Sequence, residues 1–255
     1  MFESMTSVFV DLSFITVMML IAISVVGGFL RGLAGFGSAM LMAGPMALLI
    51  DPIIAVAIIV ILEAGISLPL MKTAKSFVNW QLTRRLLVGA VLAAPVGVFT
   101  LQLLSAESSS QLISIVAIIA AILLLVGYQR KSATTRGKEM IVGGASGFSC
   151  GIAGIAGPPV VLYLLSGAHD HKEMRATLIY YFALIDIYVL MVLLLLGDVI
   201  FSPLIIALGC FPFMWFGAYW GSRCLANTNP KQYKLFALWM ILVGNIVSLV
   251  AVFVG

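Results

Sequence analysis

Two glycine-rich stretches of the sequence have the composition of a binding site for a small anion. GFLRGLAGFGSAM covers residues 28–40, and GFSCGIAGIAGPP covers residues 147–159. Because glycine and proline are the poorest helix formers, each stretch predicts a break in the helix that contains it. A helix that restarts after the break begins with unpaired N–H groups and a partial positive charge, which favour an anion. Pro158 suits the first turn of the second restarted helix.

The two restarted helices predict one anion site, framed by their N-terminal ends near the membrane centre. Arg31 interrupts the apolar run beside the first break. An arginine inside a membrane usually has a partner, so it is either a counter-charge for the bound anion or a side chain that reaches back to the cytoplasmic surface. The residues expected to contact the substrate are Arg31, Gly35, Phe36, Gly37, Ser38, Gly154, Ile155, Ala156, Gly157 and Pro158.

Two acidic residues, Glu63 and Asp186, lie well inside apolar runs. A carboxyl group removed from water can hold a proton near neutral pH, so either residue is a candidate for proton coupling. The alternative is a protonated or hydrogen-bonded acid that fixes helix packing. No carboxylate pair for an ammonium group is obvious beside the helix breaks, so we expect a preference for a purely anionic substrate over a zwitterion such as taurine. Glu63 or Asp186 could still supply that negative charge if either one faces the cavity.

Enzyme and metal chemistry are poorly supported. GASG at 144–147 resembles the serine motif of intramembrane proteases, and GFSCG at 147–151 fits GxSxG. Both need a histidine base close to the serine, but His169 and His171 stand in a charged loop. The three cysteines show no CxxC spacing, so no disulfide framework or metal site is indicated. The sequence predicts a protein without enzyme activity, metal or cofactor.

The elements that must position these residues are membrane-spanning helices. The chain has 255 residues, of which 62% are hydrophobic and only 9% are charged, against about 25% charge in soluble domains. This composition predicts an all-α integral membrane protein with about eight to ten membrane segments. The apolar runs are 12–30, 38–50, 53–71, 86–104, 112–128, 140–155, 157–167, 176–196, 204–222 and 235–254. The runs 38–50, 140–155 and 157–167 are short for a crossing. The pairs 12–30/38–50 and 140–155/157–167 therefore either cross the membrane twice or enter it and return to the same side.

The loop charges predict the orientation of the chain. Lysine and arginine gather in alternate loops, at 72–85, 130–138, 172–175 and 223–234, whereas the intervening loops contain none. By the positive-inside rule, the basic loops are cytoplasmic and both termini lie outside. The net charge of +4 lies in these short loops rather than in a basic stripe, so a nucleic-acid partner is not indicated.

The glycine pattern repeats within the chain. Gly28, Gly32 and Gly35 recur 119 residues later (147 − 28 = 119), and Gly89 and Gly97 recur after 120 residues. The loops that match at this spacing have opposite charge, which predicts two halves of opposite orientation, as in many secondary transporters. The first repeat covers 1–111 with its last span at 112–128, and the second covers 129–255. All of it forms one membrane domain.

The same glycines have a simpler interpretation. Gly28 and Gly32 are spaced as in the small-xxx-small pattern of closely packed membrane helices, and so are Gly147 and Gly151. Packing alone does not explain the additional glycines and prolines nearer to the short runs.

With these motifs, the chain resembles the TauE/SafE-type sulfite exporters, also called the toluenesulfonate uptake permease family. VNWQLTRRLLVGAVLAAPVGV and FGAYWGSRCLANTNPKQYKLFALWMILVG also match, so the resemblance covers essentially the whole chain. It departs from the family where GFGSA and GIAGPP replace a tight run of glycines. The resemblance implies a secondary transporter that moves sulfite or an organosulfonate, such as sulfoacetate or sulfolactate, by alternating access. The alternative is a passive anion channel on the same scaffold.

The expected setting follows from this resemblance and from the loop charges. We expect a multi-pass protein of the bacterial cytoplasmic (inner) membrane. Its partners are membrane lipid, a small anionic substrate and, if an acid is coupled to transport, protons. The sequence leaves a homo-oligomer open.

Overall fold

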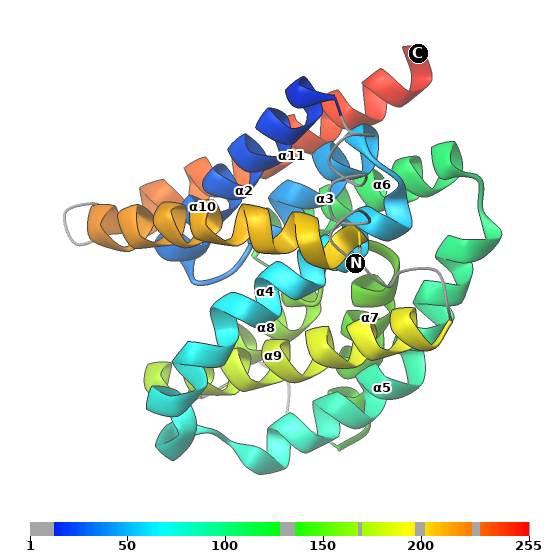
Figure 1. Cartoon of the computed structure of the whole chain (residues 1–255). Coiled ribbons are helices and arrows are strands. Elements are labelled where there is room, and N and C mark those ends of the chain that lie inside the picture. Colours follow the sequence, from blue (N-terminus) through cyan, green and yellow to red (C-terminus); the bar gives the residue numbers. More distant parts are fainter. Residues whose placement is uncertain (1–12, 128–135, 168–169, 197–201, 226–229, 255) are drawn as a thin grey trace.

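The computed structural model describes residues 13–127, 136–167, 170–196, 202–225 and 230–254. These residues form helices without any β-strand (Figure 1), which confirms the predicted all-α class. The helices are α2 (Phe14–Ala34), α3 (Ser38–Leu49), α4 (Pro52–Ala74), α5 (Trp80–Leu103), α6 (Ala106–Val126), α7 (Arg136–Ala153), α8 (Gly157–Ser166), α9 (His171–Leu195), α10 (Ser202–Leu225) and α11 (Pro230–Val254), with a 3-10 turn, η1 (Lys75–Phe77), after α4.

Each predicted apolar run corresponds to one of these helices. Among the described residues, seven helices are long and apolar enough to cross a membrane: α2, α4, α5, α6, α9, α10 and α11. α3 has 12 residues and α8 has 10, so at about 1.5 Å per residue neither spans the roughly 30 Å hydrocarbon layer. α7 is 18 residues long but has Arg136, Lys138 and Glu139 in its first turn.

Several helices start at residues with clear local signals. The Asp51 carboxylate accepts hydrogen bonds from the N–H groups of Ile53 and Ile54, and Pro52 follows it in the first turn of α4. Asn79 caps α5 by accepting from the N–H of Leu82, 3.0 Å away. These caps satisfy N–H groups that would otherwise lack a partner. The local sequence therefore determines where α4 and α5 begin.

Glycines bring two pairs of helices into backbone contact. Between α2 and α10, a methyl group added to Gly28 would lie 2.0 Å from the carbonyl oxygen of Met214. Between α5 and α7, a methyl group added to Gly147 would lie 2.3 Å from the carbonyl oxygen of Ala90. No side chain fits at either position. The small-xxx-small interpretation is therefore correct for Gly28 and Gly147, which stand inside continuous helices and do not break them.

Of the seven described helices long enough to cross a membrane, α4 is the most buried, and it packs against α9, α3 and α10. Its residues 55–60 have no exposed surface. In Figure 1 this helix runs through the middle of the molecule, between the α2–α10 pair and the α5–α9 side. A side chain on the next turn of α4, such as Glu63, is therefore held in the interior of the protein.

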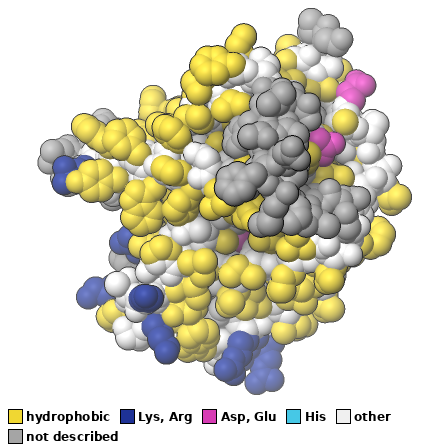
Figure 2. Space-filling model, in the orientation of Figure 1, with side chains coloured by type: hydrophobic (Ala, Val, Ile, Leu, Met, Phe, Trp, Pro, Cys, Tyr) yellow, Lys and Arg dark blue, Asp and Glu magenta, His cyan; other side chains and the backbone are white. Residues whose placement is uncertain are grey.

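The charged side chains separate along the molecule. Lysine and arginine gather along the lower and left margins of the face in Figure 2, whereas acidic side chains lie toward the upper right. Among the described residues, Lys72, Arg84, Lys172 and Arg223 are exposed. This separation agrees with the predicted alternation of loops. The prediction that the basic end is cytoplasmic, with both termini outside, stays a prediction. Of the basic positions used for it, 130 and 131 lie outside the described residues.

Candidate functional site

Three glycines with left-handed backbone conformation produce the two helix breaks. Gly35 ends α2 with φ 77°, and its N–H donates to the carbonyl oxygen of Arg31 at 2.8 Å. Gly37 precedes α3 with φ 96°. Gly154 follows α7 with φ 68°, and its N–H donates to the backbone carbonyl oxygen of Cys150 at 2.8 Å. Because most L side chains disfavour positive φ, glycine favours these breaks, as the sequence predicted.

Two serines of α7 donate hydrogen bonds to the backbone of the second break. The Ser146 hydroxyl donates to the carbonyl oxygen of Ala156, and the Ser149 hydroxyl donates to that of Ile155 at 2.7 Å. These are the serines of the two protease-like motifs. Both hydroxyls satisfy backbone carbonyls of the break, and His169 lies outside the described residues. The geometry thus gives these serines a structural role.

The restarted helices begin without side-chain caps. Neither Gly37 before α3 nor Ala156 before α8 provides a capping hydrogen bond. The first turn of α3, from Ser38, contains no proline, whereas the first turn of α8 contains Pro158 and Pro159, which lack N–H groups. The N-terminus of α3 therefore offers more backbone donors to an anion than that of α8.

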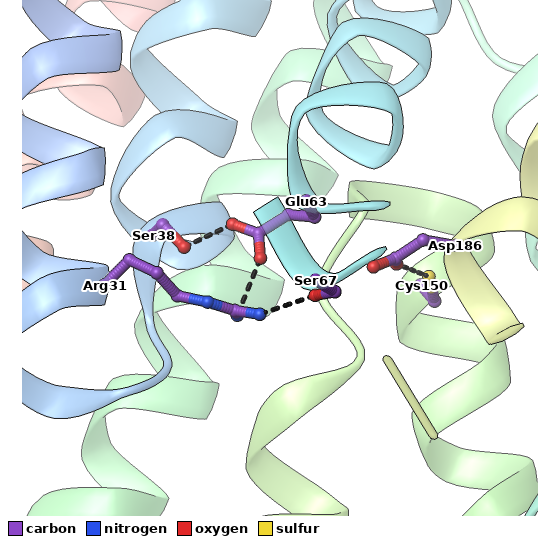
Figure 3. A network of polar contacts seen from close by, with 6 residues as sticks. All are labelled: Arg31, Ser38, Glu63, Ser67, Cys150 and Asp186. Carbon is purple, nitrogen blue, oxygen red and sulfur yellow. Dashed lines mark hydrogen bonds and ion pairs between the residues drawn. The ribbon is translucent and has the colours of Figure 1, made fainter. Parts of the chain in front are cut away.

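Arg31 is paired inside the protein. One guanidinium nitrogen lies 2.7 Å from a carboxylate oxygen of Glu63, and the other donates to the hydroxyl of Ser67 at 2.8 Å (Figure 3). The second carboxylate oxygen of Glu63 accepts a hydrogen bond from Ser38, the first residue of α3. Arg31 is 8% exposed and Glu63 is 3% exposed. The interpretation of Arg31 as a side chain that reaches the membrane surface is therefore wrong.

Asp186 lies beside the second break, as Glu63 lies beside the first, but its polar partner is different. It is 2% exposed and accepts a hydrogen bond from the thiol of Cys150 at 3.5 Å (Figure 3). Cys150 stands 119 residues after Arg31 (150 − 31 = 119), which is the spacing of the glycine repeat. Among the described residues, no basic group lies within ion-pair distance of Asp186. One break therefore has a paired cation, and the other has a thiol.

Both breaks line one pocket. Its empty volume is about 310 Å³ including the part open to the exterior, but only about 20 Å³ accepts the centre of a water-sized sphere, and one water needs roughly 10–15 Å³ on this scale. By this measure the pocket has room for about one or two water molecules. The lining residues are Arg31, Phe36, Gly37, Ala39, Met40, Glu63, Gly154, Ile155, Ala156, Gly157, Phe182 and Asp186.

Seven of the ten residues expected to contact the substrate line this pocket. The other three are Gly35, which sets the backbone, Ser38, which binds Glu63, and Pro158, which is buried in the first turn of α8. Sequence reasoning missed Phe182, whose ring centre lies 5.7 Å from the Arg31 guanidinium carbon. It stands one helical turn before Asp186, so the helical period could have identified it.

Asp186 and Glu63 both face this pocket. The sequence left open whether either acid faces the cavity, because sequence positions do not reveal which way a helix faces. The preference for a purely anionic substrate over a zwitterion stays a prediction, and these two acids make a direct test necessary.

The fold and the pocket together define a class: a polytopic membrane protein with a buried polar site between two interrupted helices. A family model described as "Sulfite exporter TauE/SafE" matches residues 20–247 of the chain. The chain belongs to this family, which confirms the resemblance seen in the sequence. No curated protein and no solved structure gives a significant match. The family is one of membrane transporters, in keeping with a non-enzymatic role.

Proposed function

We propose that this protein is a secondary transporter of a small sulfur-containing oxyanion, sulfite or an organosulfonate, that works by alternating access. The observation that carries the proposal is the meeting of two helix starts, at Gly37 and Gly157, in one buried pocket that also contains Arg31. Free N–H groups and a guanidinium are the donors that an oxyanion requires. Membership of the sulfite exporter family supports sulfur oxyanions as the substrate class.

The helix packing supports two inverted repeats as the moving parts. A methyl group added to Gly217 of α10 would lie 2.9 Å from the backbone nitrogen of Phe29 in α2. One added to Gly97 of α5 would lie 2.4 Å from the carbonyl oxygen of Phe148 in α7. The two contacts correspond at the repeat spacing, since 217 − 97 = 120 and 148 − 29 = 119. Each half would thus supply one helix to each tight pair, with repeats at 1–111 plus 112–128 and at 129–255.

The small volume of the pocket supports a carrier over a channel. A passive anion channel needs a continuous water-filled path. In this pocket only about 20 Å³ is open to the centre of a water-sized sphere, as expected of a carrier that must rearrange to admit its substrate. The proposed setting is a bacterial cytoplasmic membrane, with both termini on the outer face.

The experiment is counterflow with purified protein in liposomes. Vesicles loaded with unlabelled sulfite, isethionate or taurine receive a trace of the labelled compound outside. We expect transient, saturable accumulation of at least one sulfur oxyanion, with sulfate and acetate as comparison anions. Downhill equilibration without accumulation would instead assign the channel function, and no flux of any of these compounds would overturn both.

Taurine and isethionate form a matched pair in this assay, because they differ only in an ammonium or a hydroxyl group. Preference for isethionate supports a purely anionic substrate. Preference for taurine would assign Asp186 to an ammonium group, since Asp186 is the pocket acid that lacks a cationic partner among the described residues.

A further inference from the structure

The carboxylate of Glu63 occupies the position that an external anion would be expected to take. It is bound by the Arg31 guanidinium at 2.7 Å and by the hydroxyl of Ser38 in the first turn of α3. These are the strongest donors at the first break. The protein therefore supplies its own anion to half of the proposed substrate site.

Both terminal guanidinium nitrogens of Arg31 already have a partner. One end of the guanidinium is held by Glu63 and the other by Ser67, and Phe182 lies beside it. An oxyanion that binds both terminal nitrogens must displace at least one of these partners, and Glu63 is the one with the same charge as the substrate.

Charge balance decides what happens to the displaced acid. Arg31 and Glu63 are neutral as a pair, so an added monoanion would leave one uncompensated negative charge in a buried site, which costs several kcal/mol. One proton on Glu63 removes that charge and leaves Arg31 paired with the substrate. Deeply buried charges persist only when they are paired.

Among the described residues in contact with Glu63, Arg31 is the cation. Arg31 comes from α2, Asp186 from α9 and Cys150 from α7, and the last two interact electrostatically with Glu63. α3 contributes the Ser38 hydroxyl, and α4 itself contributes Ser67 beyond Arg31. α10 places the Phe211 ring against the neighbouring Gly65 of α4. Among these described neighbours, both other titratable groups are acidic, which disfavours a second free carboxylate.

We propose that Glu63 is the proton-binding residue of this transporter and that its carboxylate and the substrate oxyanion compete for Arg31. When the substrate binds Arg31, Glu63 takes one proton from the aqueous phase, so that one proton and one monoanion occupy the site together. The inference rests on the proposed function and makes the protein a proton–anion symporter. Among the described residues Asp186 forms no ion pair, so a bound substrate has no cation to take from it.

The test measures the pH dependence of isethionate binding to the purified protein by calorimetry. Isethionate keeps a single negative charge from about pH 5 to about pH 8, unlike sulfite. Where each binding event must take up one proton, the affinity falls about tenfold for each unit by which the pH rises. Titrations in buffers of different ionisation enthalpy report that proton directly on the wild-type protein.

Two variants separate the acids. Glu63→Gln should bind isethionate with no pH dependence and no proton uptake, at the affinity that the wild type reaches at low pH. Asp186→Asn should retain the tenfold slope. Proton uptake of zero in the wild type would overturn the inference, as would a slope that survives Glu63→Gln or disappears in Asp186→Asn. If Glu63→Gln does not fold, the wild-type proton count still decides.

Failure of the proposed function looks different. In that case the wild type binds neither isethionate nor sulfite at any pH, and the counterflow assay shows no accumulation. Binding and counterflow without proton uptake would leave a sulfur oxyanion carrier and remove only the role of Glu63.

Discussion

The two helix breaks have similar backbones and different chemistry. Each follows a long helix, contains a glycine in the left-handed region and leads into a short helix whose start lines the same pocket. The first break holds the Arg31–Glu63 ion pair, whereas Cys150 and Asp186 stand at the second. A similar backbone frame thus supports one half-site with an ion pair and one without. Under the proposed function, the first break would recognise the anion and the second would complete its enclosure.

The largest expected effect comes from the glycine of the second break. A methyl group at Gly154 would lie 2.9 Å from a methyl carbon of Ile59, and its φ of 68° adds strain. Gly154→Val should abolish transport while the protein still reaches the membrane. At Gly35 the added group meets nothing within 4 Å, so only the φ of 77° resists substitution.

Asparagine tolerates this backbone region better than valine does, which provides the matched control. Gly35→Asn should keep most of the counterflow activity, and Gly35→Val should lose most of it. Counterflow at the parental rate in both valine variants, Gly35→Val and Gly154→Val, would show that the breaks serve packing only.

The second effect concerns the ion pair. Arg31→Gln leaves a buried carboxylate without its cation, which typically costs about 3–5 kcal/mol, so the melting temperature in detergent should fall steeply. Cys150→Ala removes only a weak thiol hydrogen bond at 3.5 Å and should shift it little. The double variant Arg31→Gln/Glu63→Gln should recover most of the stability without recovering isethionate binding. Equal losses in Arg31→Gln and Cys150→Ala would remove the difference between the two breaks.

The features predictable from sequence are those set by local composition. The ten apolar runs became ten helices, although several extend into polar flanks: α5 begins at Trp80 and not at 86, and α9 at His171 and not at 176. The breaks were signalled by glycine and proline. The Arg31–Glu63 pair could not be predicted, because it joins residues 32 positions apart and depends on how α2 and α4 rotate against each other.

The glycines show the same limit. Gly32 and Gly35 look alike in sequence, yet Gly32 packs against the backbone of α10 while Gly35 ends α2. Only the position of the neighbouring helix distinguishes a packing glycine from one that sets the backbone. Asn245 gave no sequence signal at all, and it proves to be the main polar anchor of α3.

The third and smallest effect compares how the two short helices are anchored. The Asn245 amide of α11 accepts from the N–H of Gly44 at 3.2 Å and donates to the carbonyl oxygen of Met40 at 2.9 Å. In the C-terminal half of α8, the Tyr163 hydroxyl donates a hydrogen bond to Glu139 of α7 at 3.4 Å. Asn245→Ala should cost about 1–3 kcal/mol, because it leaves buried polar groups without a partner.

Tyr163→Phe is the matched comparison and should cost under about 0.5 kcal/mol, because Glu139 stays paired with Arg85 at 2.9 Å. Thermal unfolding of both variants checks the order. If Tyr163→Phe destabilises the protein more than Asn245→Ala does, then α8 and not α3 is the more firmly anchored half-helix.

The most direct test of the account is the position of a bound substrate analogue. An experimental structure with 2-bromoethanesulfonate, whose bromine is visible by anomalous scattering, locates the anion without assumptions about transport. The account predicts that the sulfonate lies in the pocket between Gly37 and Gly157 and contacts Arg31, with Glu63 turned away from the guanidinium. A sulfonate bound elsewhere, with the Arg31–Glu63 pair intact, would contradict it.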